Sequence, residues 1–152
     1  MFPLPLVAAL AVATTPAPAP AAASSLRLET HLFGERRVAA VDGTTRTELV
    51  TPDHLGPGDR VVVQLRYRNT GGQSLSGVVI ANPVPRNLAY RGPRSGPAPE
   101  VSVDGRRFGP LADLRVGERA ATLSDVTHVR WRLPTSLTAG SGGEFTFQAI
   151  VR

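Results

Sequence analysis

The sequence predicts an all-β fold, an antiparallel sandwich, and three observations support this prediction. From Leu26 onward apolar side chains recur at every second residue, which is the period of a strand and not of a helix. Glycine and proline interrupt the chain at short intervals, as they do between the strands of a sandwich. Cysteine is absent, but a domain of ~130 residues buries about two thirds of its unfolded surface and needs neither disulfide nor metal.

The chain is expected to begin with a signal peptide, residues 1–23. Residues 4–13 form an apolar run of the length of a signal-peptide core, whereas a bilayer span takes about 20 apolar residues. Ala21 and Ala23 offer the small side chains that precede a cleavage site.

One feature departs from an ordinary leader, because no Lys or Arg lies near Met1. A start upstream of Met1 is the alternative, and a disordered linker is the alternative for residues 14–25. The remaining chain, 24–152, is expected to form one exported domain, periplasmic or extracellular, with no membrane span.

The first predicted strands lie around a hairpin turn. One strand starts at Leu26 and reaches His31–Phe33. Two more, Arg37–Val41 and Thr45–Val50, flank Asp42-Gly43, where glycine allows the positive φ of a tight turn. Residues 52–57 are expected to form a loop because they are rich in Pro and Gly.

The clearest strand follows Gly58-Asp59. Its alternate residues divide into an inward set, Val61, Val63, Leu65 and Tyr67, and a mostly solvent-facing set, Val62, Gln64, Arg66 and Arg68.

Later strands are shorter and end at prolines or glycines. Strands are expected over Leu75–Ala81, Leu88–Arg91, Glu100–Val103, Arg106–Phe108 and Val126–Leu133, and a terminal strand presents Phe145, Phe147, Ala149 and Val151 on one face. Asp104-Gly105 is a second hairpin turn, and Leu111–Leu123 is a loop or one helical turn. Eight or nine short strands are typical of an immunoglobulin-like sandwich. Its expected core comprises Val63, Leu65, Tyr67, Trp131, Phe145 and Phe147.

Several of these residues also form a recognisable series. Gly58-Asp59 opens a long strand, Tyr67-Arg68-Asn69-Thr70-Gly71 follows, and Val78–Pro85 ends the next strand. This series resembles the DUF11 family, the conserved repeat domain of bacterial surface and secreted proteins, over about residues 55–152. The stretch 125–131 is similar to single-copy secreted members from Gram-negative bacteria. The resemblance implies an immunoglobulin-like sandwich in an envelope or extracellular setting, and it implies no reaction. Asn82 stands where the family usually has an acid.

No arrangement of residues indicates catalysis, a cofactor or a metal. The three histidines, His31, His54 and His128, lack the spacing of a zinc site. Asp53-His54 is the most catalytic-looking pair, but adjacent residues are poorly placed for the contact between a base and its orienting carboxylate. The chain is therefore expected not to be an enzyme and to need no cofactor.

The net charge of +5 is carried entirely by arginine, since none of the 17 basic residues is lysine. One interpretation is an anion-contact face, and the other is a solvated sheet face in a chain that uses arginine throughout. The candidate residues for such a face are Arg66, Arg68, His128, Arg130 and Arg132. The charges are dispersed among 12 acids, so nucleic-acid binding is not expected.

Together these observations favour a non-catalytic structural or interaction module of the cell envelope or the secreted fraction, whose partner is a protein or a wall polymer. A binder of anionic envelope polymers such as lipopolysaccharide is one alternative, and an accessory domain of an enzyme or surface assembly is another. Self-association through edge strands is a further expectation, with Leu26–Phe33 and Glu144–Arg152 as the candidate edges.

Overall fold

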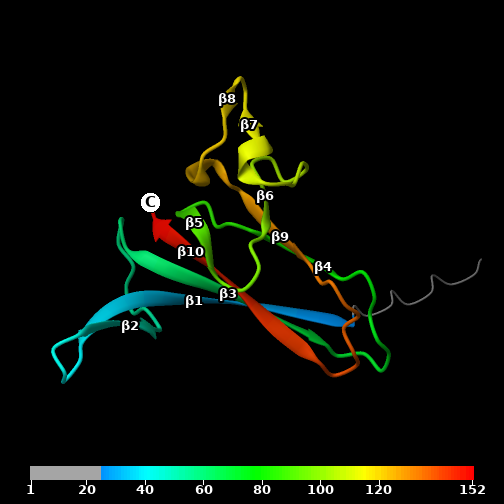
Figure 1. The fold of residues 1–152 in the computed structure, drawn as a ribbon, viewed down its shortest axis with the longest axis horizontal. Helices are drawn as coiled ribbons and strands as arrows, with labels where there is room; N and C mark the ends of the chain where they lie inside the picture. The colour runs from blue at the N-terminus through cyan, green and yellow to red at the C-terminus, as the bar shows by residue number, and fades with distance from the viewer. Residues whose placement is uncertain (1–24) are drawn as a thin grey trace, which may run out of the picture.

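The structure is a computed structural model that describes residues 25–152, so the expected signal peptide lies outside the described residues. The described chain is almost entirely extended, with two single-turn 3₁₀ helices, and the predicted antiparallel all-β sandwich is confirmed (Figure 1). The strands are β1 (Leu26–Ala39), β2 (Thr45–Val50), β3 (Arg60–Asn69), β4 (Val79–Pro83), β5 (Leu88–Ser95), β6 (Glu100–Ser102), β7 (Arg115–Val116), β8 (Arg119–Ala120), β9 (His128–Arg132) and β10 (Gly142–Val151). The helices are η1 (Leu111–Asp113) and η2 (Leu123–Asp125).

Two antiparallel sheets form the layers of the sandwich. The larger has the order β2-β1-β3-β10-β5 and the smaller the order β4-β9-β6, while β7 and β8 make a separate ribbon that extends from the sandwich in Figure 1. The terminal strand β10 lies between β3 and β5, so the expectation that it forms an edge is wrong. Its inward side chains, Phe145 and Phe147, lie in the middle of the core, as expected for a strand with neighbours on both sides.

The strand β1 is longer than expected, because the residues between Phe33 and Arg37 continue it without a break. Gly34 is the point where its neighbours change: it pairs with Val61 of β3 on one side and with Val50 of β2 on the other. The Asp42-Gly43 turn that connects β1 with β2 forms as predicted, with Gly43 at φ 81°.

The predicted alternation along β3 holds with one correction. Val63 and Leu65 are buried in the core, and Tyr67 is half-buried against it. Val62 was placed in the solvent-facing set, yet it is 0% exposed. It points away from the core, and neighbouring side chains on the outer side of the sheet cover it.

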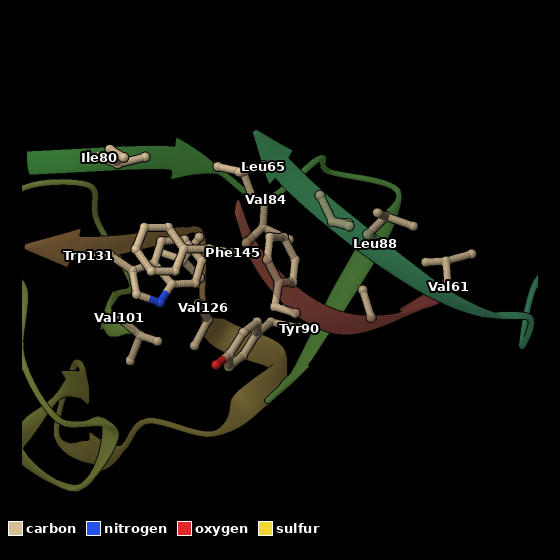
Figure 2. Packing of buried hydrophobic residues seen from close by; sticks show 14 of the residues in the cluster. Val61, Leu65, Ile80, Val84, Leu88, Tyr90, Val101, Val126, Trp131 and Phe145 are labelled. Atoms are coloured by element: carbon tan, nitrogen blue, oxygen red, sulfur yellow. The ribbon is translucent and has the colours of Figure 1, made fainter. Parts of the chain in front are cut away.

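The two sheets are joined by a stack of aromatic rings. Trp131 of β9 lies against Phe145 of β10 (Figure 2), and the two rings are parallel with centroids 4.7 Å apart. Tyr67 stacks on the same phenyl ring at 5.2 Å. The indole Nε1 donates to the carbonyl of Pro97 at 3.0 Å, so the buried donor is satisfied. The predicted role of Trp131 in the core is confirmed.

The smaller sheet departs most from the predicted strands. Of the expected strand Leu75–Ala81 only Val79–Ala81 is extended as part of β4, which continues to Pro83, although Leu75 forms an isolated bridge with Leu137. Residues Arg106–Phe108 do not pair as a strand, because the carboxylate of Asp104 accepts hydrogen bonds from the Arg106 and Arg107 N–H groups and curls the chain. The helical turn expected within Leu111–Leu123 is present as η1.

A buried polar side chain fixes the end of β3. Asn69 is 0% exposed, and its Nδ2 donates to the carbonyls of Gln73 at 2.7 Å and Leu137 at 3.0 Å. Its Oδ1 accepts from the N–H of Gly71 at 3.0 Å. The Asn69-Thr70-Gly71 sequence is therefore a structural turn in which the amide side chain replaces backbone partners.

Candidate functional site

The outer face of the five-stranded sheet carries most of the protein's excess charge. Because side chains alternate along a strand, the neighbours of the core residues on β1, β3 and β10 point outward, and the pairing places them on one surface. This surface, here called the basic face, holds Arg27, Arg37, Arg60, Arg66, Arg68, Arg91 and Arg94 together with Glu29, Glu35 and Glu144. Seven arginines against three glutamates give the strands of this face a formal excess of four positive charges, and Asp53 and Asp59 lie beside Arg37 and Arg60 in an adjoining hollow.

An open groove of about 990 Å³ crosses one end of the basic face. Arg27, Arg66 and Arg68 line it from the neighbouring strands β1 and β3. Arg27 is paired with Glu29 at 2.8 Å, and Arg66 lies 3.7 Å from the carboxylate of Glu144. Within residues 25–152 Arg68 has no ion pair, so its guanidinium is available to an anion in the groove.

Two glycines at the start of β10 lie beside this groove and pack closely against Tyr67. A Cβ on Gly142 would lie 2.2 Å from the carbonyl oxygen of Tyr67, and one on Gly143 would lie 2.5 Å from the Tyr67 hydroxyl. Larger residues therefore require β3 or Tyr67 to move. Both glycines pair with β3 and belong to the strand.

The other end of the basic face contains a smaller hollow of about 210 Å³, lined in part by Arg60 and Arg91. Beside it Arg94 of β5 reaches across β10 and β3 to form an ion pair with Glu35 of β1. The Glu35 side chain is only 11% exposed. This bridge crosses the strands on either side of Val62, and Arg37, Arg60 and Arg91 are the other arginines at this end.

The outer face of the smaller sheet has a different electrostatic character. Arg130 donates to Glu100 through Nε at 2.8 Å, and its guanidinium lies 4.1 Å from the centre of the Phe108 ring. Arg132 is 3.5 Å from the same carboxylate. The hydrogen bond from Arg130 is the main cause of a lowered pKa of Glu100. Both arginines are therefore engaged within the protein.

The predicted anion-contact stripe is consequently divided between two faces. Arg66 and Arg68 lie on the basic face, whereas His128, Arg130 and Arg132 point outward from β9 in the opposite layer. His128 packs against Gly105 and contacts the Thr127 hydroxyl through Nδ1 at 3.0 Å. A single ligand on one face cannot contact all five residues, because the core separates the two sets.

The sequence did not identify the remaining arginines of the basic face. Those on β5 depend on the register of a distant strand that is interrupted by two bulges. One signal was available for Arg27, because Arg27 and Glu29 alternate with Leu26 and Leu28 in the pattern of a one-sided strand.

Asp53 and His54, the most catalytic-looking pair, line an open hollow of about 520 Å³ together with Asp59. Within residues 25–152 no hydrogen bond or ion pair joins the His54 imidazole to either carboxylate. Asp53 and His54 are exposed, and Asp59 accepts a hydrogen bond from the Gly56 N–H at 2.8 Å, which fixes the loop. Asp125 is engaged by Arg119, which is the main cause of its lowered pKa, and by Thr122. Across residues 25–152 no three His, Asp or Glu side chains gather as metal ligands. None of the helices in this same range has the length and apolar character to cross a membrane.

Comparisons with known proteins add no further identification: no family model, curated protein or solved structure matches this chain. The resemblance to the DUF11 family therefore stays a prediction from the sequence.

Proposed function

We propose that this protein is a non-catalytic interaction module that binds anionic polymers through the basic face of its five-stranded sheet. The expected signal peptide favours a polymer of the cell envelope, and lipopolysaccharide is the example we propose to test. The observation that carries this proposal is the concentration of seven arginines on one sheet face, where three glutamates oppose them.

Arginine suits this task because its planar guanidinium donates two parallel hydrogen bonds to a phosphate or carboxylate and stays charged at every physiological pH. In the groove Arg68 forms no ion pair with another described residue, and Arg66 forms a long pair of 3.7 Å with Glu144. Exchanging that pair for a ligand anion costs little, since exposed ion pairs contribute about 0–1 kcal/mol.

The arrangement favours a polymer over a small anion. Arginines that form no ion pair with any of residues 25–152 lie at both ends of the sheet, Arg68 in the groove and Arg60 and Arg91 at the smaller hollow. A chain with repeated negative groups contacts both ends at once, whereas a single phosphate contacts one. Each additional contact adds to the affinity and to its salt dependence.

The decisive experiment compares two double variants on immobilised heparin and on lipopolysaccharide vesicles. Arg66→Ser with Arg68→Ser removes two charges from the basic face, and Arg130→Ser with Arg132→Ser removes two from the opposite layer. We expect the first double variant to elute from heparin at clearly lower salt. In a plot of log affinity against log salt concentration, its slope should be shallower by about one unit for each arginine removed.

The second pair is the matched control, because it removes the same net charge from residues that Glu100 already engages. Equal losses from the two pairs would show a response to net charge alone and would contradict the proposal. Binding to heparin without binding to lipopolysaccharide would retain the anion-binding face and reject the envelope polymer. Near-ultraviolet circular dichroism of Trp131 checks that both variants are folded.

A further inference from the structure

The N-terminal half of β1 is an open sheet edge. This half pairs with β3 on one side, whereas β2 covers the other side only from Gly34 to Ala39. Over Arg27–Phe33 no described strand pairs with the second side. Such an edge presents backbone N–H and C=O groups that another strand can bind.

Prolines, bulges or a covering bridge protect the edges β4, β5 and β6, and this edge shares the absence of all three with β2. Pro93 and two register shifts interrupt β5, Pro83 ends β4, and the short β6 is covered on its outer side by a bridge between Val101 and Gly109. The Arg27–Phe33 segment has no proline and no bulge, and it pairs with β3 in uninterrupted register. It also exposes a large apolar side chain, since Leu28 is 40% accessible.

We propose that the ligand of this edge is a second copy of the chain, which pairs with it antiparallel about a two-fold axis at Leu28. In this register Leu28 lies opposite Leu28 of the second copy, which covers the exposed apolar surface. Arg27 lies opposite Glu29 of the second copy, and the symmetry makes this pair twice. Opposite charges in directly opposed positions stabilise antiparallel strands, and like charges destabilise them.

Other registers are less favourable, and an axis at Arg27 places two guanidinium groups directly opposite each other. An axis at Glu29 places two carboxylates directly opposite each other. An axis at Thr30 brings Leu26 of one copy to the position beside Gly34 of the other, where Val50 is already paired. Registers shifted by one residue mismatch the inner and outer faces, because the side-chain period of a strand is two.

The dimer also has a consequence for the basic face. A two-fold axis normal to the sheet keeps the outer faces of both copies on the same side, so the two faces become continuous. The groove lined by Arg27, Arg66 and Arg68 lies at the join, because Arg27 flanks the axis. This consequence rests on the proposed function, whereas the dimer itself does not.

The test uses the absence of cysteine from the chain. Directly opposed residues of antiparallel strands have Cα atoms about 4.5–5.5 Å apart, within the range that a disulfide bridges. We expect Leu28→Cys to form a disulfide-linked dimer under mild oxidation. Thr30→Cys and Thr47→Cys should remain largely monomeric, with at least a tenfold lower yield of dimer. Thr30 tests the register, and Thr47 tests the other exposed edge, β2.

A second pair of variants tests the non-covalent dimer by analytical ultracentrifugation. Leu28→Asp should weaken association at least tenfold, whereas Leu49→Asp on β2, with the same charge change and a matched exposure of 41%, should not. Equal cross-linking of the Thr47 variant, failure of the Leu28 variant to cross-link, or a monomeric native chain at millimolar concentration would overturn the proposal.

The two proposals fail separately. The Leu28→Asp variant, if monomeric, should still bind heparin, but its binding should depend less on salt than that of Leu49→Asp. This result supports both the edge pairing and the proposed function. A dimer that forms normally but does not bind heparin overturns the proposed function and retains the edge pairing.

Discussion

The two outer faces of the sandwich carry similar residues and differ in what those residues can do. On the smaller sheet Arg130 and Arg132 converge on one carboxylate, and Phe108 covers the guanidinium of Arg130. On the larger sheet seven arginines share three glutamates, and Arg68 in the groove has no ion pair within the described chain. An arginine on a strand is thus a candidate for binding only where the fold does not supply its counter-ion.

The two faces differ because one core separates them, and Trp131 packs in that core between the two sheets. We expect Trp131→Ala to lower the free energy of unfolding by about 3–5 kcal/mol, because it leaves a cavity beside Phe145. Chemical denaturation measures this loss. Arg132→Ser, one residue away on the exposed side, should change stability by less than about 0.5 kcal/mol. A similar loss in both variants would contradict the packing role of Trp131.

Each sheet also contains a fully buried polar side chain at its end, Asn69 in the larger and Ser102 in the smaller. Asn69→Ala removes three hydrogen bonds and should cost about 2–3 kcal/mol. Ser102→Ala removes the bonds from the N–H groups of Gly105 at 2.9 Å and Asp104 at 3.3 Å and the bond to the Asp104 carboxylate at 3.0 Å. Because the second of these is long, the loss should be about 1–2 kcal/mol. Urea unfolding of both variants measures the two losses in free energy of unfolding. A larger loss for Ser102→Ala than for Asn69→Ala would contradict this prediction.

The difference between the faces should be removable by one substitution. Glu100→Gln takes away the carboxylate that engages Arg130 and Arg132 and leaves a neutral side chain of the same size. We expect the variant to elute from heparin at higher salt than the native protein. Glu118→Gln, an exposed control with the same charge change, should have a smaller effect. If both variants shift equally, internal pairing does not distinguish the two faces.

The smallest effect concerns the two Asp-Gly turns, one beside each sheet. Hydrogen bonds from the N–H groups of Arg106 and Arg107 lower the pKa of Asp104 to about 2, from an ordinary value of 3.8. A carboxyl whose pKa is lower in the folded state stabilises the fold above its unfolded pKa, and this contribution is lost as the pH falls through the folded value. Asp104→Ala should therefore lower the melting temperature at pH 7, and the difference from the native protein should disappear near pH 2.

Asp42→Ala is the matched variant at the turn of the larger sheet. The pKa of Asp42 is lowered mainly by the hydrogen bond from the Thr44 hydroxyl. Its melting temperature should depend on pH in the same direction and less strongly. A pH-independent difference for both variants would show that the carboxylate charge contributes nothing at these turns.

Residue pattern alone predicted much of the large sheet. In a strand, successive side chains point to opposite faces, so the face of one residue determines the faces of its neighbours. This period alone separates Val63, Leu65 and Tyr67 from Gln64, Arg66 and Arg68. Asp42-Gly43 could be recognised as a turn for a similarly local reason, since glycine reaches positive φ without steric cost. The predicted strands of the small sheet were less accurate, because Asp104 and Ser102 redirect the chain there through side-chain hydrogen bonds.

By itself, therefore, the sequence determined the fold class, the core residues and the absence of a disulfide framework, all of which depend on local period and composition. Only the tertiary structure decided that β10 is central, that Arg66 and Arg130 lie on opposite sides, and that Val62 is covered from outside. These properties depend on which distant strands become neighbours. Pairing partners are chosen by the burial of the whole core, and no short stretch of residues contains that information.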